Sequence, residues 1–169
     1  GFNQERLNGM KILLNTIEKG LNTKTKHYFL GSSFEVLEKL KKELKTQYPE
    51  VLIEGTLSPP FGSEEEIIKF IDKNKNKFMN TDILWIGLGM PKQEVIMNHL
   101  KQMNLKIAGI GAVFEWVAGT KSVAPSIMQN LGLEWLYRLF KEPRRLWKRY
   151  FFDFSYIVKK NILNLLKIK

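Results

Sequence analysis

The chain has 169 residues, of which 44% are hydrophobic and 26% are charged, and it contains no cysteine. This composition is typical of a globular domain rather than a disordered chain, and the length is sufficient for one hydrophobic core. The lack of cysteine excludes disulfides and thiolate metal sites, and it is compatible with a reducing compartment. No apolar run reaches about 18 residues, so we expect no membrane-spanning helix. The N-terminal residues do not have the pattern of a signal peptide.

The positive charge is concentrated near the C-terminus. The whole chain has a net charge of +10. Residues 138–169 contain ten Lys or Arg and two acidic residues, a net charge of +8, which leaves +2 for the rest. This basic tail therefore predicts an anionic partner, either a membrane surface or a nucleic acid.

Segments with the pattern of strands alternate with segments with the pattern of helices. The expected strands are 26–31, 50–55, 82–89 and 105–112, and the expected helices are 32–45, 64–78, a segment opened by Pro91, and 125–140 with the tail. Strands that alternate with helices form parallel sheets. The sequence therefore predicts an α/β fold with a Rossmann-like parallel sheet, flanking helices and a basic amphipathic helical C-terminal tail.

Two serines are expected to begin helices. Ser32 with Glu35, and Ser63 with Glu66, have the spacing of a capping box, in which serine and acid each satisfy a backbone N–H of the other. The continuous apolar run within 82–89 predicts a strand that is buried on both faces.

Glycines follow three of the predicted strands: Gly31, then Gly87 and Gly89, then Gly109 and Gly111. Ligands of open parallel sheets bind beyond the carboxyl ends of the strands. The turn "GLGMPKQE" leads into a helix N-terminus, whose free N–H groups and dipole suit a phosphate or diphosphate. Tight turns alone explain the same glycines. The spacing is neither G-x-G-x-x-G nor a Walker motif, so ordinary dinucleotide and nucleoside triphosphate sites are not supported.

The residues after these glycines have polar side chains suited to a ligand. Pro91 fits the first turn of a helix, where its missing N–H costs little. Gln93 can both donate and accept hydrogen bonds. Lys92 is either a phosphate contact or a solvated side chain, and Glu94 complements the helix dipole.

The sequence shows no obvious catalytic triad or metal cluster. His27 and His99 are isolated, and we expect each to be structural or at the surface. Asp82 stands alone, without an Asp-x-Asp pattern. No metal ligand set is therefore assigned.

Three segments together resemble the WecG/TagA/CpsF glycosyltransferase family. They are "DILWIGLGMPKQE", "AGIGAVFEWVAGT" and "APSIMQNLGLEWLYRLFKEPRRLWKRY", and the resemblance covers about residues 5–150. "ERLNG" resembles the E-R-x-x-G element of the family, and "SPPFG" resembles a loop of its capsule-type branch. The resemblance implies a bacterial enzyme of teichoic acid, common antigen or capsular polysaccharide synthesis. Such enzymes transfer an N-acetylmannosamine-type or related sugar from a UDP donor to an undecaprenyl-diphosphate-linked sugar.

The resemblance also implies site residues. The active-site positions are Arg6 and Gln93. The substrate-binding positions that it implies are Gly87, Gly89, Pro91, Lys92, Gly109 and Gly111, and the strand-end and helix-start patterns add Gly31 and Glu94. The positions of the basic appendage that completes the site and associates with the membrane are Glu134, Arg138, Arg144, Arg145 and Arg149.

The implied reaction is an inverting transfer without a divalent metal or other cofactor, with the UDP-sugar as a substrate. A base removes a proton from the acceptor hydroxyl, which attacks the anomeric carbon while UDP leaves. Helix N-termini and Arg6 would stabilise the negative charge that develops on UDP.

The sequence departs from the family in two places. The N-terminal stretch that carries the acidic residue proposed as catalytic base is absent, so we expect either a fragment or a catalytically impaired copy. Val123 stands before Ala124 and Pro125 where the family usually has arginine. A positive charge near the acceptor is thereby lost, and Lys121 could partly replace it.

We expect two parts, a glycosyltransferase domain over 1–137 and a membrane-associating appendage over 138–169. The expected location is the cytoplasm, at the inner face of the bacterial membrane, and a second copy of the chain stays open as a partner. Two alternatives differ in class: a non-catalytic remnant that binds UDP-sugar, and a nucleic-acid-binding module. The charge is confined to the tail and no nucleic-acid-binding motif is present, so nucleic acid is not the expected partner.

Overall fold

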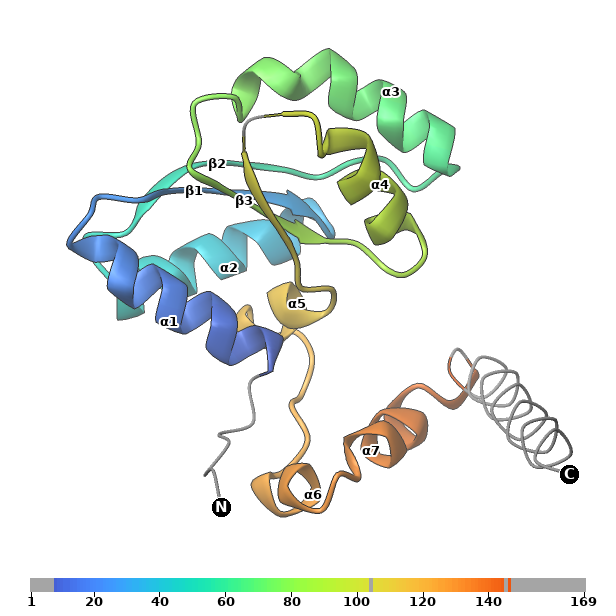
Figure 1. Cartoon of the computed structure of the whole chain (residues 1–169). Helices are drawn as coiled ribbons and strands as arrows, with labels where there is room; N and C mark the ends of the chain where they lie inside the picture. Colours follow the sequence, from blue (N-terminus) through green and yellow to red (C-terminus); the bar gives the residue numbers. More distant parts are fainter. Residues whose placement is uncertain (1–7, 104, 145, 147–169) are drawn as a thin grey trace, which may run out of the picture. The chain divides into compact units, whose positions relative to one another are not determined.

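The computed structural model describes residues 8–103, 105–144 and 146 (Figure 1). The chain divides by compactness into two units, Gly1–Ser122 and Val123–Lys169. Each unit is described by itself. Within the described residues, none of the helices combines the length and the apolar character needed to cross a membrane.

The first unit contains a four-stranded parallel sheet, and the predicted Rossmann-like α/β fold is confirmed. Its strands are β1 (Lys26–Gly31), β2 (Leu52–Leu57), β3 (Ile83–Gly87) and β4 (Lys106–Gly109), in the order β2-β1-β3-β4. The chain runs from β1 outward to β2 and then returns to the other side of β1 for β3. The strand order therefore reverses between β1 and β3, and this is the switch point at which α/β sheets bind ligands.

Helices cover both faces of the sheet (Figure 1). In chain order they are α1 (Gly9–Leu21), α2 (Phe34–Gln47), α3 (Glu64–Asn74), the short 3-10 helix η1 (Lys75–Lys77), α4 (Lys92–Leu100) and α5 (Val113–Val117). The helices α1, α2 and α5 pack on one face, and α3 and α4 pack on the other.

The central strand β3 supplies side chains to two hydrophobic cores. Trp85 packs with the core under α1, α2 and α5, whereas Leu84 and Ile86 pack with the core under α3 and α4. All three side chains are buried, which confirms the prediction of a strand buried on both faces.

The two predicted capping boxes have different outcomes. The Ser63 side chain caps α3, and Glu66 returns the bond to the Ser63 backbone, as predicted. The prediction for Ser32 is wrong, because Ser33 is the N-cap of α2. The chain turns tightly through Gly31 and Ser32, both with positive φ, and this turn delays the helix by one residue.

In the part of the second unit that the structure describes, the helices α6 (Ser126–Asn130) and α7 (Glu134–Lys141) follow one another. The helical segment expected over 125–140 is interrupted, because Gly132 adopts a φ of 72° between the two helices. Residues 147–169, which hold most of the predicted basic tail, lie outside the described residues.

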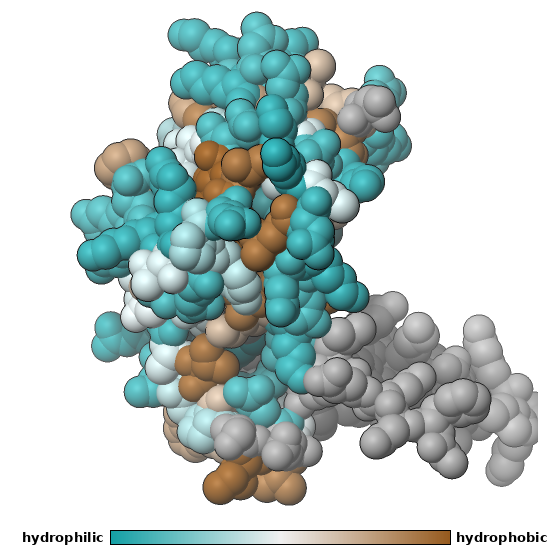
Figure 2. Space-filling view, turned by 90° about the vertical axis from the view of Figure 1, so that its left-hand side faces the viewer, coloured by the Kyte–Doolittle hydropathy of each residue, from teal (hydrophilic) through white to brown (hydrophobic). Residues whose placement is uncertain are grey.

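Most of the face drawn in Figure 2 is hydrophilic, with separate apolar spots between the hydrophilic residues.

Candidate functional site

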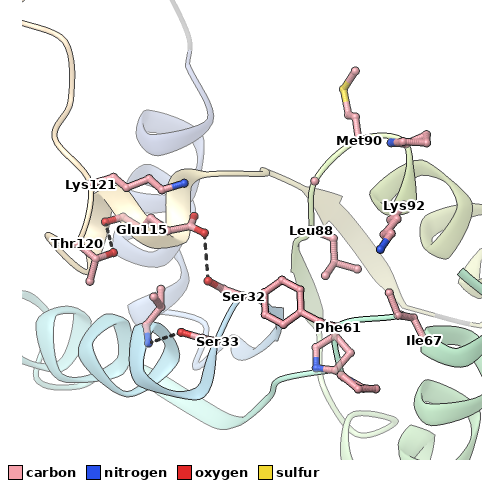
Figure 3. Close-up of a pocket in the computed structure, with 15 residues that line it drawn as sticks. Ser32, Ser33, Phe61, Ile67, Leu88, Met90, Lys92, Glu115, Thr120 and Lys121 are labelled. Carbon is pink, nitrogen blue, oxygen red and sulfur yellow. Dashed lines mark hydrogen bonds between the residues drawn. The ribbon is translucent and has the colours of Figure 1, made fainter. Parts of the chain in front are cut away.

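A cavity of about 590 Å³ lies at the carboxyl ends of the strands of the first unit (Figure 3). Segments that follow all four strands line it: Ser32, Ser33 and Val36 after β1, Pro59, Pro60, Phe61 and Ile67 after β2, Leu88–Lys92 after β3, and Glu115, Thr120 and Lys121 after β4. The volume is within the usual range of small-molecule sites. The glycine-marked edge predicted as the ligand side of the sheet is therefore hollow.

The two strands at the switch point approach closely where they end. Gly31 pairs with Gly87, and the Ser32 N–H donates to the Gly87 carbonyl oxygen at 3.1 Å. A Cβ atom on Gly31 would lie 2.6 Å from the Gly87 carbonyl carbon. Gly31 also has a φ of 128°, which side chains rarely allow, so glycine is required here.

Ser32 connects this turn to two other parts of the cavity wall. Its carbonyl oxygen accepts a 2.7 Å hydrogen bond from the Ser58 hydroxyl, which belongs to the segment after β2. Its own hydroxyl donates to Glu115 Oε1 at 3.1 Å. Figure 3 shows the two side chains pointing toward one another. Ser32 therefore fixes Glu115 from one side.

The second carboxylate oxygen of Glu115 has no such partner. Glu115 Oε2 is buried, and it makes no hydrogen bond to any described residue. A buried polar atom without a partner costs free energy, because it has lost its hydrogen bonds to water. Glu115 lines the cavity, so a ligand hydroxyl or N–H is a suitable donor for Oε2.

The opposite rim of the cavity is apolar. Phe61 is 99% exposed and Met90 is 60% exposed, although both line the cavity. An exposed aromatic ring at a cavity rim offers a flat face to a base or a sugar. The cavity thus combines a polar wall at Glu115 with an apolar wall at Phe61.

The "GLGMPKQE" turn lines the cavity from Leu88 to Lys92. The peptide bond before Pro91 is cis. The N–H groups of Gln93 and Glu94 donate to the carbonyl oxygens of Gly89 and Pro91, at 3.2 and 3.1 Å. The expectation of free N–H groups is therefore wrong for these two residues, because the tight turn supplies their acceptors.

Gln93 points toward the end of β4. It is 9% exposed, and its Oε1 accepts a 2.9 Å hydrogen bond from the Gly111 N–H. A Cβ atom on Gly109 would lie 2.6 Å from Gln93 Nε2, so glycine allows the amide to pack against β4. The structure thus brings Gln93, Gly109 and Gly111 together, but none of the three lines the cavity.

The remaining predicted positions are spread over the chain. Glu94 is exposed and does not line the cavity. Glu134 and Arg138 lie on α7, and Arg144 follows that helix in the second unit. Arg6, Arg145 and Arg149 lie outside the described residues.

Both histidines have the structural or surface roles predicted for them. His27 is 1% exposed, and its Nδ1 accepts a 3.1 Å hydrogen bond from Trp85 Nε1. His99 pairs with Asp72 at 2.9 Å near the surface. Among the described residues, no group of three or more His, Cys, Asp or Glu side chains could hold a metal ion.

Sequence reasoning missed most of the cavity lining, including the three residues Phe61, Glu115 and Ser32. Phe61 belongs to "SPPFG" and Glu115 to "GAVFEWVAGT", two segments that carried the resemblance without being assigned a role. For Ser32 the spacing predicts only a helix cap. A carboxylate a few residues after a glycine-ended strand was the available signal for Glu115.

The family comparison covers essentially the whole chain. A model described as "Glycosyl transferase WecG/TagA/CpsF family" matches residues 1–168. The matched range includes the segments after β1, β2, β3 and β4 that line the cavity. A glycosyltransferase role in cell-surface polysaccharide synthesis is thereby supported, as is the use of a sugar-nucleotide donor and a lipid-linked acceptor in general. The chain belongs to the WecG/TagA/CpsF glycosyl transferase family.

Proposed function

We propose that the cavity binds the UDP part of a UDP-sugar. The chain would then transfer an N-acetylhexosamine-type sugar, similar to N-acetylmannosamine, to an undecaprenyl-diphosphate-linked sugar. The observation that carries this proposal is a cavity of about 590 Å³ at the switch point between β1 and β3. Parallel α/β sheets bind nucleotides at this place, and the family supplies the chemistry.

The two walls of the cavity suit the two halves of a nucleoside. Glu115 Oε2 is buried without a described partner and could accept a hydrogen bond from a ribose hydroxyl. The exposed ring of Phe61 could stack on the base. A nucleoside in this orientation would leave the diphosphate and the sugar free to extend toward the acceptor.

The proposed reaction is an inverting displacement without a divalent metal. The acceptor hydroxyl loses its proton to a base, attacks the anomeric carbon and expels UDP. Arg6 is proposed to stabilise the diphosphate charge. Gln93 stays the second proposed active-site residue, and its bond to Gly111 holds the end of β4 in place. We assign no base among the described residues.

The acceptor is a lipid, and we propose that residues 138–169 bind the inner face of the membrane. The support is the net charge of +8 in this segment, because each basic residue near an anionic surface contributes about 1 kcal/mol. Sedimentation with anionic vesicles should decrease with added salt and in Arg144→Ala, Arg145→Ala and Arg149→Ala variants. Equal binding to neutral vesicles would contradict this part of the proposal.

Calorimetry with UDP tests the cavity. Glu115→Gln keeps the shape of the side chain but weakens the acceptor, so we expect about a tenfold loss of UDP affinity. Glu38→Gln changes an exposed glutamate of α2 that does not line the cavity, and it should leave the affinity unchanged. If the folded wild-type chain does not bind UDP, the proposal is wrong.

A transfer assay separates the enzyme from a remnant that only binds its donor. The wild-type chain is incubated with the UDP-sugar and a lipid-linked acceptor, and released UDP is measured. Turnover that survives a chelator supports the metal-independent enzyme. Binding of UDP without turnover supports the non-catalytic alternative.

A further inference from the structure

One peptide unit next to the cavity is held at both of its polar ends. It joins Gly62 to Ser63, between β2 and α3. The Gly62 carbonyl oxygen accepts a 2.6 Å hydrogen bond from Lys92 Nζ, and the Ser63 N–H donates to Glu66 Oε2 at 2.7 Å. An ammonium group and a carboxylate therefore hold the two ends of one peptide dipole, and both hydrogen bonds are charge-assisted.

The carboxylate of this pair is ionised at neutral pH. Hydrogen bonds from the backbone and side chain of Ser63 lower the pKa of Glu66, and the charges of Lys69 and Lys92 act in the same direction. Gly62 leaves room for this arrangement, because a Cβ atom there would collide with the Glu66 carboxylate. A side chain at position 62 would thus push the carboxylate away from the Ser63 N–H.

The held peptide directly follows Phe61, the exposed ring at the cavity rim. An exposed loop tip has few packing contacts of its own, so its conformation depends on how the neighbouring backbone is fixed. Lys92 belongs to α4, which follows β3, whereas Phe61 follows β2. The Lys92 hydrogen bond therefore ties together two of the four segments that line the cavity.

The hydrogen bond to Gly62 also shows in which direction the ammonium group of Lys92 points. The side chain lines the cavity, but its ammonium group reaches the Gly62 carbonyl. In Figure 3 the amine points toward the side of the cavity on which Phe61 and Ile67 lie. A lysine engaged in this way is a weaker candidate for a direct phosphate contact than its place in the "GLGMPKQE" turn implies.

We propose that Lys92 and Glu66 form a clamp on the Gly62–Ser63 peptide that holds Phe61 at the rim of the donor site. Lys92 is then a positioning residue for the nucleoside rather than a ligand of the diphosphate. This role in binding rests on the proposed UDP site, whereas the clamp itself does not.

Two binding measurements separate positioning from phosphate contact. Lys92→Met removes the ammonium group and keeps the length of the side chain. If Lys92 positions Phe61, the variant should lose affinity for UDP and for uridine by the same factor, about tenfold or 1.4 kcal/mol. Lys92→Arg, which keeps a cationic donor, should recover part of the affinity. A loss confined to UDP would overturn the proposal, because uridine has no phosphate.

Amide hydrogen exchange tests the clamp without any ligand. Exchange of the Ser63 amide, measured by NMR, should become faster by about fivefold or more in Lys92→Met and in Glu66→Gln. Lys101→Met changes an exposed lysine at the other end of α4 and should leave this amide unchanged. Unchanged exchange in both clamp variants overturns the proposal. Circular dichroism confirms that each variant is folded.

The binding and hydrogen-exchange experiments also distinguish the failure of this inference from the failure of the proposed function. If the wild-type chain binds neither UDP nor uridine, the proposed UDP site is wrong and the positioning role falls with it. The exchange rates still decide whether Lys92 and Glu66 clamp the peptide.

Discussion

The amino and carboxyl edges of the sheet, at the two ends of the parallel strands, differ in whether their polar groups have hydrogen-bond partners. At the amino edge, the Lys26 N–H donates to Asp82 Oδ2 at 2.8 Å, and the Asp82 N–H donates to the Lys26 carbonyl oxygen at 3.0 Å. Trp85 and His27 complete a buried hydrogen bond nearby. At the carboxyl edge, Glu115 keeps a buried oxygen without a described partner.

Backbone conformation separates the two edges as well. The carboxyl edge contains Gly31 and Ser32, two consecutive residues with positive φ. Positive φ costs glycine little, but for a residue with a side chain such as Ser32 it costs about 1–3 kcal/mol and persists only when the surrounding structure imposes it. The comparison teaches that the amino edge pairs its polar groups within the fold, whereas the carboxyl edge leaves Glu115 Oε2 without a described partner and thus open to a ligand donor. Four substitutions or conditions test this difference.

The largest effect is expected for Gly31→Ala. The new Cβ atom would meet the Gly87 backbone, which cannot move without separating β1 from β3, and the φ of 128° adds strain. We expect a loss of about 3 kcal/mol or more in the free energy of unfolding, measured with urea. Gly89→Ala is the matched control, because nothing lies within 4 Å of its Cβ position. Equal losses in the two variants would contradict the close approach at the switch point.

Trp85→Phe tests the amino edge. It removes the N–H that His27 Nδ1 accepts and leaves this buried acceptor without its partner. We expect a loss of about 2 kcal/mol in the free energy of unfolding. UDP affinity of the folded variant should stay the same, because Trp85 does not line the cavity. A marked change in affinity would show that the two edges are coupled.

Acid should weaken the amino edge through His27. Burial lowers the pKa of His27 below 6.5, and the nearby Asp82 carboxylate opposes this effect only in part. The unfolded chain therefore binds a proton first as the pH falls. The stability contribution is present above about pH 6.5 and is lost below it, with a slope of at most about 1.4 kcal/mol per pH unit.

Urea unfolding at pH 7.5 and pH 5.5 measures this slope. His27→Gln should remove it, whereas His99→Gln, at the surface, should retain it. A slope that persists in His27→Gln would assign the effect to other groups.

The smallest effect on stability is expected for Ser32→Gly at the carboxyl edge. Glycine accepts the φ of 55° without strain, and this gain offsets the loss of the hydrogen bond to Glu115. The free energy of unfolding should change by less than about 1 kcal/mol. UDP affinity should nevertheless decrease, because Glu115 loses the contact that orients it. Unchanged affinity would mean that Ser32 has no positioning role.

The parts of the fold that follow regular patterns were predictable. The strand-like pattern of residues 26–31 located β1, and the capping box of Ser63 and Glu66 located the start of α3. The apolar run within 82–89 identified β3. The N-cap of α2 was predicted one residue early, because the positive φ of Ser32 comes from a tertiary contact with Gly87. No pattern rule led to α1, and β2 begins two residues later than expected.

The sequence predicted the edge of the sheet and the turn with Gly89, Pro91 and Lys92, but not the other walls of the cavity. Glycine-ended strands identified the carboxyl edge, which is general to parallel sheets. Glu115 and Phe61 lie in irregular segments, and their relation to the cavity depends on four chain segments that meet only in the fold. The direction of the Gln93 side chain depends on Gly109 and Gly111, so the sequence alone could not indicate that it faces β4.

The lack of a side chain at Gly87 has a consequence for the width of the cavity. A Cβ atom at position 87 would lie 2.6 Å from Phe114 Cε2, so the ring rests directly on the backbone of β3. Phe114 also packs edge-on against Phe29 in the core. The next residue along the chain is Glu115, and its distance from β3 is thus set by the thickness of one aromatic ring. The hydrophobic core therefore sets the position of Glu115 in the cavity wall. A side chain of another size at position 114 would change the width of the cavity even if every lining residue stayed the same.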